Sequence, residues 1–334
     1  MIDGCDLLNR RRLYRKGDNM EHSDKLRSHL FTTYYAPRGR SRIYGLGIQL
    51  AQQYLSPFDK LIGVIGEAGS GKSALIKGMF PGLELTNDDD GVNVRPLPIL
   101  QQDYEQGFFT PHTYHLDIRF EMGFHQLSVL AGAILQAIKR GKRVIVEHFD
   151  IVYPMLNMNA DLLIGVGEEI VLTRPRIFGP FPDEIYEMVY TSLPYRLMAH
   201  TAEDICEYFM PKDEISRCTH DDIRHGFIVA FPDYQPNFDL VDLENKVNDV
   251  IKREIPVSYY DDNHIKIGDL IHPCTGPRTH VSNTNMIKEF HLLHHFIYDV
   301  INKRYLMVGC VGENSLEKLK SLDSVNEPMS VMIK

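Results

Sequence analysis

Short apolar runs alternate with segments of helical periodicity between residues 60 and 172. Leu61–Ile65 and Arg143–Glu147 are compact runs of the kind found in strands that are buried on both faces. Residues 125–140 carry apolar side chains at helical spacing, and Asp161–Val166 and Ile170–Leu172 are further candidate strands. Strands separated by helices predict an α/β domain with a mostly parallel sheet covered on both faces. Shorter elements are expected as helices over 45–54 and 73–79 and a strand over 83–85.

The pattern changes after the proline-rich stretch 175–182. A long helix over 183–209, a strand over 226–231 and a helix over 240–253 precede several short strands beyond Pro256, which is an α+β order. We therefore expect a basic, partly disordered N-terminal segment, an α/β domain, an α+β domain and a C-terminal tail over residues 1–44, 45–185, 186–312 and 313–334.

Composition fits a folded protein of two ordinary domains, because 43% of the 334 residues are hydrophobic and 24% are charged. The net charge of −9 argues against coating of nucleic acid, although a local basic patch can still bind a tRNA end. No apolar stretch reaches the roughly 18–20 residues of a membrane helix, so no membrane partner is expected. The five cysteines are scattered, which favours a cytoplasmic protein with free or metal-bound thiols.

Basic residues cluster near the N-terminus in two places. We interpret residues 1–20 as a disordered tail, or as an upstream extension if Met20 is the true start. Arg38, Arg40 and Arg42 either contact phosphates or form a solvated basic loop.

Residues 66–73 match the phosphate-binding loop G-x-x-x-x-G-K-[ST] at every fixed position, between an expected strand and an expected helix. Glycines allow backbone N–H groups to face phosphate oxygens, Lys72 can reach the β- and γ-phosphates, and Ser73 can ligate Mg²⁺. The predicted nucleotide-binding residues are Gly66, Glu67, Ala68, Gly69, Ser70, Gly71, Lys72 and Ser73. The sequence therefore predicts that the domain over 45–185 is a P-loop domain that binds a nucleoside triphosphate with Mg²⁺.

Phosphoryl transfer also requires a carboxylate that positions the metal. The candidates in this domain are Asp88–Asp90, Asp117, Glu147 and Asp150. Glu147 and Asp150 follow a buried-type strand, where such a ligand is expected, so we assign them catalytic roles together with Lys72. No N-K-x-D guanine motif follows, which favours ATP over GTP.

The loop and the Val-Ile-Val-Glu strand end resemble uridine-kinase-like small-molecule kinases. This resemblance implies an ATP-dependent phosphotransferase. His148, beside Glu147, either assists proton transfer or is structural.

A second group of chemical residues comes after residue 190. His200-Thr-Ala-Glu-Asp204 and Cys274-Thr-Gly-Pro-Arg-Thr-His280 resemble the metal-binding motifs of the second additional domain of alanyl- and threonyl-tRNA synthetases, an editing module. Gly226–Phe231 and Leu243–Val257 resemble the strand and helix between those motifs. The resemblance covers roughly residues 190–312 and implies a zinc site at which the 3′ end of a mischarged tRNA is hydrolysed.

Helical spacing agrees with such a site, because residues four apart share a face and His200 and Asp204 can point at one ion. Cys274 and His280 complete a set of ligands that Zn²⁺ accepts. Two features depart from the family: Asp204 replaces a histidine, and five residues instead of three separate Cys274 from His280. Carboxylate is a tolerable zinc ligand, but the substitution weakens the expected affinity and selectivity, and a retained fold without metal is the alternative.

The remaining histidines and cysteines of this half have simpler interpretations. His291, His294 and His295 are expected at the surface or in the core, and Cys206, Cys218 and Cys310 as buried thiols.

Three hypotheses for the whole chain follow. The first, which we prefer, is a kinase-like phosphotransferase or ATPase whose synthetase-like domain binds a tRNA 3′ end, an amino acid or a nucleoside acceptor. It resembles bacterial nucleoside kinases that carry a synthetase-like domain in the reverse order. The second is a metal-dependent aminoacyl-tRNA deacylase regulated by nucleotide, and the third a non-enzymatic sensor of nucleotide and tRNA.

Overall fold

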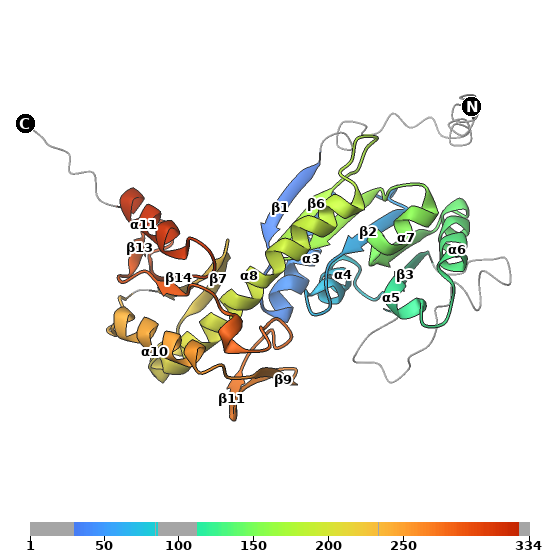
Figure 1. Cartoon of the computed structure of the whole chain (residues 1–334). Coiled ribbons are helices and arrows are strands. Elements are labelled where there is room, and N and C mark those ends of the chain that lie inside the picture. Colours follow the sequence, from blue (N-terminus) through green and yellow to red (C-terminus); the bar gives the residue numbers. More distant parts are fainter. Residues whose placement is uncertain (1–29, 84, 86–111, 233, 327–334) are drawn as a thin grey trace, which may run out of the picture.

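The structure, a computed structural model, describes residues 30–83, 85, 112–232 and 234–326 (Figure 1). The basic segment 1–20 and the candidate carboxylates Asp88–Asp90 lie outside these residues, as does the end of the expected tail.

A six-stranded sheet forms the first domain, in the order β1-β6-β5-β2-β4-β3. Its strands are β1 Phe31–Tyr35, β2 Leu61–Ile65, β3 Thr113–Asp117, β4 Arg143–Glu147, β5 Leu162–Val166 and β6 Glu169–Thr173. The four strands β5, β2, β4 and β3 are parallel, whereas β6 runs antiparallel to β5 and β1 antiparallel to β6. The sheet is therefore mixed, with its parallel part at the strands that carry the site residues.

Helices cover both faces of this sheet (Figure 1). They are α3 Arg40–Tyr54, α4 Lys72–Met79, α5 Ile118–Glu121, α6 Leu127–Lys139 and α7 Phe149–Leu156, together with the first half of α8 Pro182–Phe209. In β2, Leu61 and Ile65 pack in the core under α6 and α7, whereas Ile62 and Val64 pack in the core under α3 and α4. Because alternate residues enter opposite cores, the strand reads as one continuous apolar run.

Helices α3 and α4 meet at glycines. A Cβ at Gly47 would lie 2.5 Å from the carbonyl oxygen of Leu75, and one at Gly78 would lie 2.1 Å from that of Tyr44. Only residues without a side chain allow this backbone approach, which fixes the helix that follows the phosphate-binding loop.

The second domain combines two antiparallel sheets with helices. The larger sheet holds β12 His291–Leu292, β14 Arg304–Cys310, β8 Gly226–Pro232 and β7 Thr219–Ile223, with β13 Ile297–Asp299 paired to β14. The smaller sheet holds β9 Val257–Asp261, β10 His264–Ile267 and β11 Leu270–Pro273. The helices are α9 Lys212–Ile215, α10 Leu240–Lys252, the 3-10 turn η3 Thr284–Met286 and α11 Ser315–Asn326.

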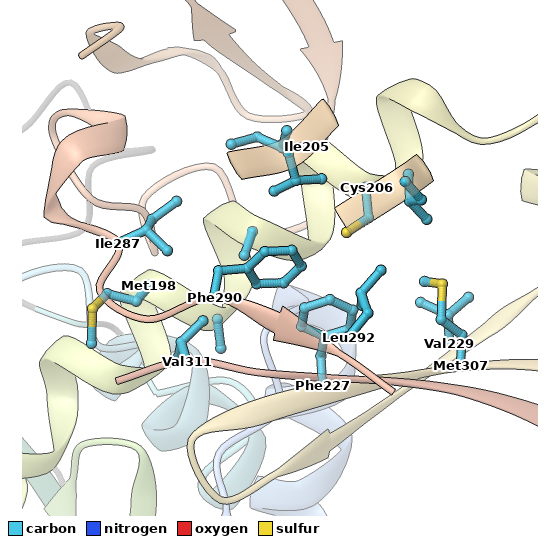
Figure 2. Packing of buried hydrophobic residues seen from close by; sticks show 14 of the residues in the cluster. Met198, Ile205, Cys206, Phe227, Val229, Ile287, Phe290, Leu292, Met307 and Val311 are labelled. Atoms are coloured by element: carbon cyan, nitrogen blue, oxygen red, sulfur yellow. The ribbon is translucent and has the colours of Figure 1, made fainter. Parts of the chain in front are cut away.

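A large apolar cluster forms the main core of this domain (Figure 2), and a smaller one contains Leu293, Val308, Cys310 and Leu319. Phe227 on β8 stacks on Phe290 with ring centroids 6.4 Å apart, and both rings are buried. Met198 and Ile205 of α8 enter the same cluster. The core of the second domain is thus built partly on the helix that also covers the first sheet.

Helix α8 runs without a break from one domain into the other (Figure 1). Ile185 and Val189 belong to the first core, and Met198, Ala202 and Ile205 belong to the second. The boundary expected near residue 185 therefore falls inside a helix. The first part of this helix packs in one core and the second part packs in the other.

Several expected elements agree with the structure residue for residue or nearly so. The strands over 61–65 and 143–147 coincide with β2 and β4, and the long helix over 183–209 with α8. Three expectations differ. Leu83 and Leu85 are not in a strand, the unpredicted β3 is the edge of the sheet, and α3 begins at Arg40 rather than Gly45. Strand β1 also places residues 31–35, expected in the N-terminal segment, in the sheet.

Within the described residues, no helix is long and apolar enough to span a bilayer.

Buried charges join the two domains. Arg38 Nε lies 2.5 Å from Asp222 Oδ1, and its Nη1 lies 3.4 Å from Glu203 Oε2. Arg42 also pairs with Asp222, so Arg38 and Arg42 hold the second domain instead of forming a solvated loop. The Glu168 carboxylate accepts a 2.5 Å hydrogen bond from the backbone N–H of His225. Burial is the main cause that raises the pKa of Glu168, to about 7.

We predict that Gly47→Ala lowers the free energy of unfolding by about 1–3 kcal/mol, because the new methyl group has to displace backbone atoms. Gly45→Ala is the matched control on the same helix, since nothing lies within 4 Å of its new Cβ. That control should be neutral or stabilising by up to about 1 kcal/mol through helix propensity. Urea unfolding measures both, and equal midpoints would contradict the close approach.

We also predict a pH dependence of stability from Glu168. Because its pKa is higher in the folded chain than the ordinary 4.5, the folded state holds the proton more tightly. The free energy of unfolding should fall as the pH rises from about 4.5 to about 7 and then stay low. Glu168→Gln should remove this fall and be more stable than wild type at pH 8, by up to about 3 kcal/mol. Glu187→Gln, an exposed glutamate of α8, is the control in the same unfolding series.

Candidate functional site

The predicted phosphate-binding loop, residues 66–73, joins the end of β2 to the start of α4. Gly69 and Gly71 have φ angles of +79° and +95°, in the left-handed region that favours glycine. A Cβ at Gly71 would also lie 2.6 Å from Ile43 Cδ1 of α3. Conformation and packing therefore both require glycine at position 71, which the motif specifies.

Lys72 lies at the centre of the loop and is buried. Its Nζ donates to the carbonyl oxygen of Glu67 at 2.9 Å and lies 3.6 Å from Glu147 Oε2. Glu67 itself pairs with Arg119 of α5 at 2.8 Å. The ammonium group thus stands between the loop and the carboxyl edge of the neighbouring strand.

Glu147 ends β4, and Asp117 ends β3 directly beside it. Ligand atoms of Asp117, Glu147 and His148 all lie within 4.8 Å of one another, and all three residues are buried. Glu147 Oε1 also bonds His115 Nε2 at 3.0 Å. Two parallel strands therefore bring two carboxylates to the same point as Lys72.

Asp150 is not part of this group. It lies in the first turn of α7, and among the described residues it does not line the cavity that Glu147 and Asp117 line. His148 has a φ of +55°, which turns the chain away from the strand direction before Asp150. Asp117, and not Asp150, therefore lies beside Glu147 at this edge of the sheet.

Burial and neighbouring charges shift the pKa values of these groups in different directions. Burial raises the pKa of Glu147, but the hydrogen bond with His115 and the charges of His115 and Lys72 outweigh it and lower the pKa. Burial and the charge of Glu147 raise the pKa of Asp117. Burial, then Lys72 and Arg119, lower the pKa of His148 to about 4, so this imidazole is neutral at pH 7. A divalent cation placed here would favour the charged form of both carboxyl groups.

A cavity of about 400 Å³ lies over this edge, between the two domains. Lys72, Ser73, Asp117 and Glu147 line it from the first domain. Tyr259, Asp262 and residues 275–279 line it from the second. A cavity of this size is in the range of small-molecule sites.

The four predicted metal ligands converge in the second domain. Cys274 Sγ lies 3.4 Å from His200 Nε2 and 3.8 Å from His280 Nε2. Asp204 Oδ2 lies 2.9 Å from His280 Nε2, and its Oδ1 lies 3.7 Å from His200 Nε2. Tetrahedral zinc with bonds of about 2.0–2.3 Å separates its ligand atoms by about 3.3–3.6 Å. The observed separations bracket these values.

Backbone groups hold the ligands in orientation. His200 Nδ1 lies 3.0 Å from the carbonyl oxygen of Thr279, and His280 Nδ1 lies 3.3 Å from that of Pro277. An Nδ1–H that donates to a carbonyl leaves Nε2 as the ligand atom. The N–H of Gly276 donates to Cys274 Sγ at 3.3 Å. These contacts fit a zinc site, and neither Asp204 nor the longer spacing prevents convergence.

The charges of the four residues also suit a cation. Burial, then the charge of His280, lower the pKa of His200, which keeps that ligand neutral. Burial raises the pKa of Asp204, but the charge of His200 and the hydrogen bond with His280 outweigh it and lower the pKa. Burial, then Asp204, raise the pKa of the Cys274 thiol, and a coordinated dication deprotonates such a thiol.

Arg196, which sequence reasoning missed, connects the two sites. It lies one helical turn before His200, on the same face of α8. Its Nη1 donates to the carbonyl oxygens of Ser70 and Gly167 at 2.7 and 3.1 Å, and its Nη2 to that of Pro37 at 2.7 Å. Its position four residues before His200, on the same helical face, was the sequence feature that could have identified Arg196.

A neighbouring acidic group needs no metal. Glu203, Glu207 and His220 bring ligand atoms together, but Arg38 pairs with Glu203 and His220 contacts both glutamates at 3.1 and 3.5 Å. Burial lowers the pKa of His220, but hydrogen bonds with Cys218 and Glu203 and both glutamate charges raise it to about 11. Two cationic side chains thus balance two carboxylates.

The other histidines and cysteines lie apart from both sites. His291 and His294 contact Glu244 of α10 at 3.3 and 3.0 Å. Cys206 and Cys310 are buried thiols as expected, whereas Cys218 is only half-buried.

No protein-family model matches the chain, and no curated protein is significantly similar to it. Conclusions about function therefore rest on the geometry of the described residues.

We predict that the purified protein holds about one zinc ion per chain and that Cys274→Ser and Asp204→Asn lose most of it, because each removes one of four ligands. Elemental analysis of the purified proteins measures this. Cys218→Ser, which lies outside the four-residue cluster, should retain the zinc. Wild type without zinc, with a stability unchanged by the two ligand substitutions, would contradict the site.

Proposed function

We propose that this chain is an ATP-dependent phosphotransferase with Mg²⁺, whose acceptor binds between the P-loop domain and a zinc-holding, synthetase-like domain. One observation supports this most strongly. The loop lysine and the carboxylates of two neighbouring strand ends face one cavity of about 400 Å³ that the second domain closes. Phosphoryl transfer needs a phosphate cradle, a metal-holding carboxylate and an acceptor position, and the cavity offers residues for each.

The roles of the residues follow from their positions. The loop N–H groups and Lys72 would bind the β- and γ-phosphates, and Ser73 would hold Mg²⁺ together with Glu147. Mg²⁺ held there would supply positive charge that balances the negative charge of the phosphates in the transition state. Asp117, with its raised pKa, is suited to accept the proton of an acceptor hydroxyl. Asp117 thus replaces Asp150 among the proposed catalytic residues, as a base and not as the metal-positioning carboxylate that Asp150 was expected to be.

The acceptor class follows from the second domain. Tyr259, Asp262 and Arg278 line the side of the cavity opposite the loop and offer an aromatic ring and both signs of charge. A nucleoside, an amino acid or the 3′ end of a tRNA presents matching groups. The scattered cysteines and the reducing conditions that free thiols need support a cytoplasmic location.

The zinc site gives less support to the deacylase hypothesis. Four protein ligands and burial of His200, Asp204 and Cys274 form a closed set. Catalytic zinc keeps a position open for water, whereas structural zinc is closed. We therefore infer a structural zinc, which suits the phosphotransferase and the sensor better than a hydrolase.

We predict that Lys72→Ala lowers ATP turnover by about 10²–10³-fold, the usual effect of removing one preorganised electrostatic donor. The assay is phosphate or product release from ATP and Mg²⁺, screened over nucleosides, amino acids and tRNA. Lys139→Ala, an exposed lysine of α6, is the control and should be unaffected.

The same assay separates the alternatives. Asp117→Asn should retain ATP binding and lose turnover with the best acceptor. Equal turnover by wild type and Lys72→Ala would refute the assigned site. Release of amino acid from mischarged tRNA without ATP would favour the deacylase, and tight binding without turnover the sensor.

A further inference from the structure

The loop between two zinc ligands is also a wall of the nucleotide cavity. All five residues of the segment 275–279, between Cys274 and His280, line the cavity that the P-loop lines. Thr279 Oγ1 donates to the carbonyl oxygen of Gly69 at 3.5 Å, and a Cβ at Gly69 would lie 2.8 Å from the carbonyl oxygen of Arg278. The segment therefore lies in contact with the turn that would cradle phosphate.

The same segment is held by the metal ligands. The carbonyl oxygens of Pro277 and Thr279 accept from the two ligand imidazoles, and the N–H of Gly276 donates to the ligand sulfur. A Cβ at Gly276 would lie 3.0 Å from His200 Cε1 and 2.1 Å from the carbonyl oxygen of Arg38. Because these contacts depend on how the ligand side chains are oriented, an ion that fixes the ligands also fixes the wall.

Arg278 is the cationic side chain that this wall adds to the cavity. Its guanidinium lies over the ring of Tyr259, 5.0 Å from the centroid, and the Tyr259 hydroxyl donates to Asp262 at 2.7 Å. Of the other arginines that line the cavity, Arg38 is paired with carboxylates, Arg196 donates to backbone carbonyls, and Arg40 lies at the start of α3. A guanidinium presents a rigid fork of N–H donors that matches phosphate oxygens.

We propose that Arg278 binds the phosphates of the nucleotide held by the P-loop, and that the ion at Cys274 and His280 positions it. This inference rests on the proposed function, since it assumes phosphates on the loop. The two sites are then linked: zinc strengthens nucleotide binding, and nucleotide strengthens zinc binding by the same factor. Typical coupling between sites is about 5–150-fold in affinity.

The first test measures Mg²⁺–ATP affinity of the full chain by calorimetry, with a non-hydrolysable analogue as the probe. Arg278→Ala with its zinc retained should bind the analogue about 10-fold more weakly or worse, the order of one charged hydrogen-bonding partner. Arg217→Ala is the matched control, because Arg217 also lies over a tyrosine, Tyr234, at 5.8 Å, outside the cavity. Unchanged affinity in zinc-loaded Arg278→Ala would overturn the phosphate contact.

The second test measures the linkage. Zinc affinity of wild type, from competition with a chelator, should rise at saturating nucleotide by about 5–150-fold, and in Arg278→Ala this rise should shrink. This readout uses the folded, zinc-binding chain and does not depend on a stable zinc-free form. Zinc affinity that is independent of nucleotide in wild type would overturn the linkage.

Lys72→Ala separates this inference from the proposed function. If wild type and Lys72→Ala bind the analogue equally, the proposed nucleotide site is wrong. If Lys72→Ala abolishes binding and Arg278→Ala does not, the nucleotide site stands and only the role of Arg278 fails.

Discussion

The guanidinium of Arg196 is the interaction on which both candidate sites depend. It is fully buried, and burial, as the main cause, lowers its pKa to about 10, so it stays charged at neutral pH. It donates to carbonyl oxygens of the P-loop, of the turn after β5 and of the segment before α3. A buried charge with these partners is costly to move, so the register of α8 against the loop is fixed. His200 and Asp204 follow on the same helix, and their positions are fixed with it.

The two sites are built in different ways. At the proposed nucleotide site, parallel strands end side by side and bring Asp117 and Glu147 to Lys72. At the candidate zinc site, one helix supplies two of the four residues and a loop supplies the other two. Strand ends hold their residues by a hydrogen-bonded ladder, whereas the loop is held by the ligands themselves. The second site is therefore the one whose geometry responds to what it binds.

Local signals made much of the fold predictable. The strands β2 and β4 are continuous apolar runs, and the P-loop glycines are required by backbone conformation. The pair at 200 and 204 follows from helical spacing. The elements that were not predicted depend on pairing between residues that lie far apart in the sequence. Strand β3 contains a buried histidine, His115, which bonds Glu147 on the adjacent strand. Asp117 was one of the candidate carboxylates in the sequence, but it could be preferred to Asp150 only once that strand was placed.

The position of the domain boundary was also difficult to predict from the sequence. Composition shifts at the prolines near residue 180, but α8 begins at Pro182 and continues to Phe209. Pro194 lies inside the helix between Val189, which packs in one core, and Met198, which packs in the other. This proline is a local feature near the division, although the expected boundary was placed at the earlier prolines.

The continuity of α8 has a mechanical consequence. At about 1.5 Å per residue, a helix of 28 residues is a rod of about 42 Å. A helix shared by two domains resists the hinge bending that separate domains use to close on a substrate, except near Pro194, where the proline removes one backbone hydrogen bond. Cutting the chain within it would also leave both halves with an exposed apolar stripe. Closure over a ligand therefore has to come from loops and side chains, or from bending of the helix at Pro194.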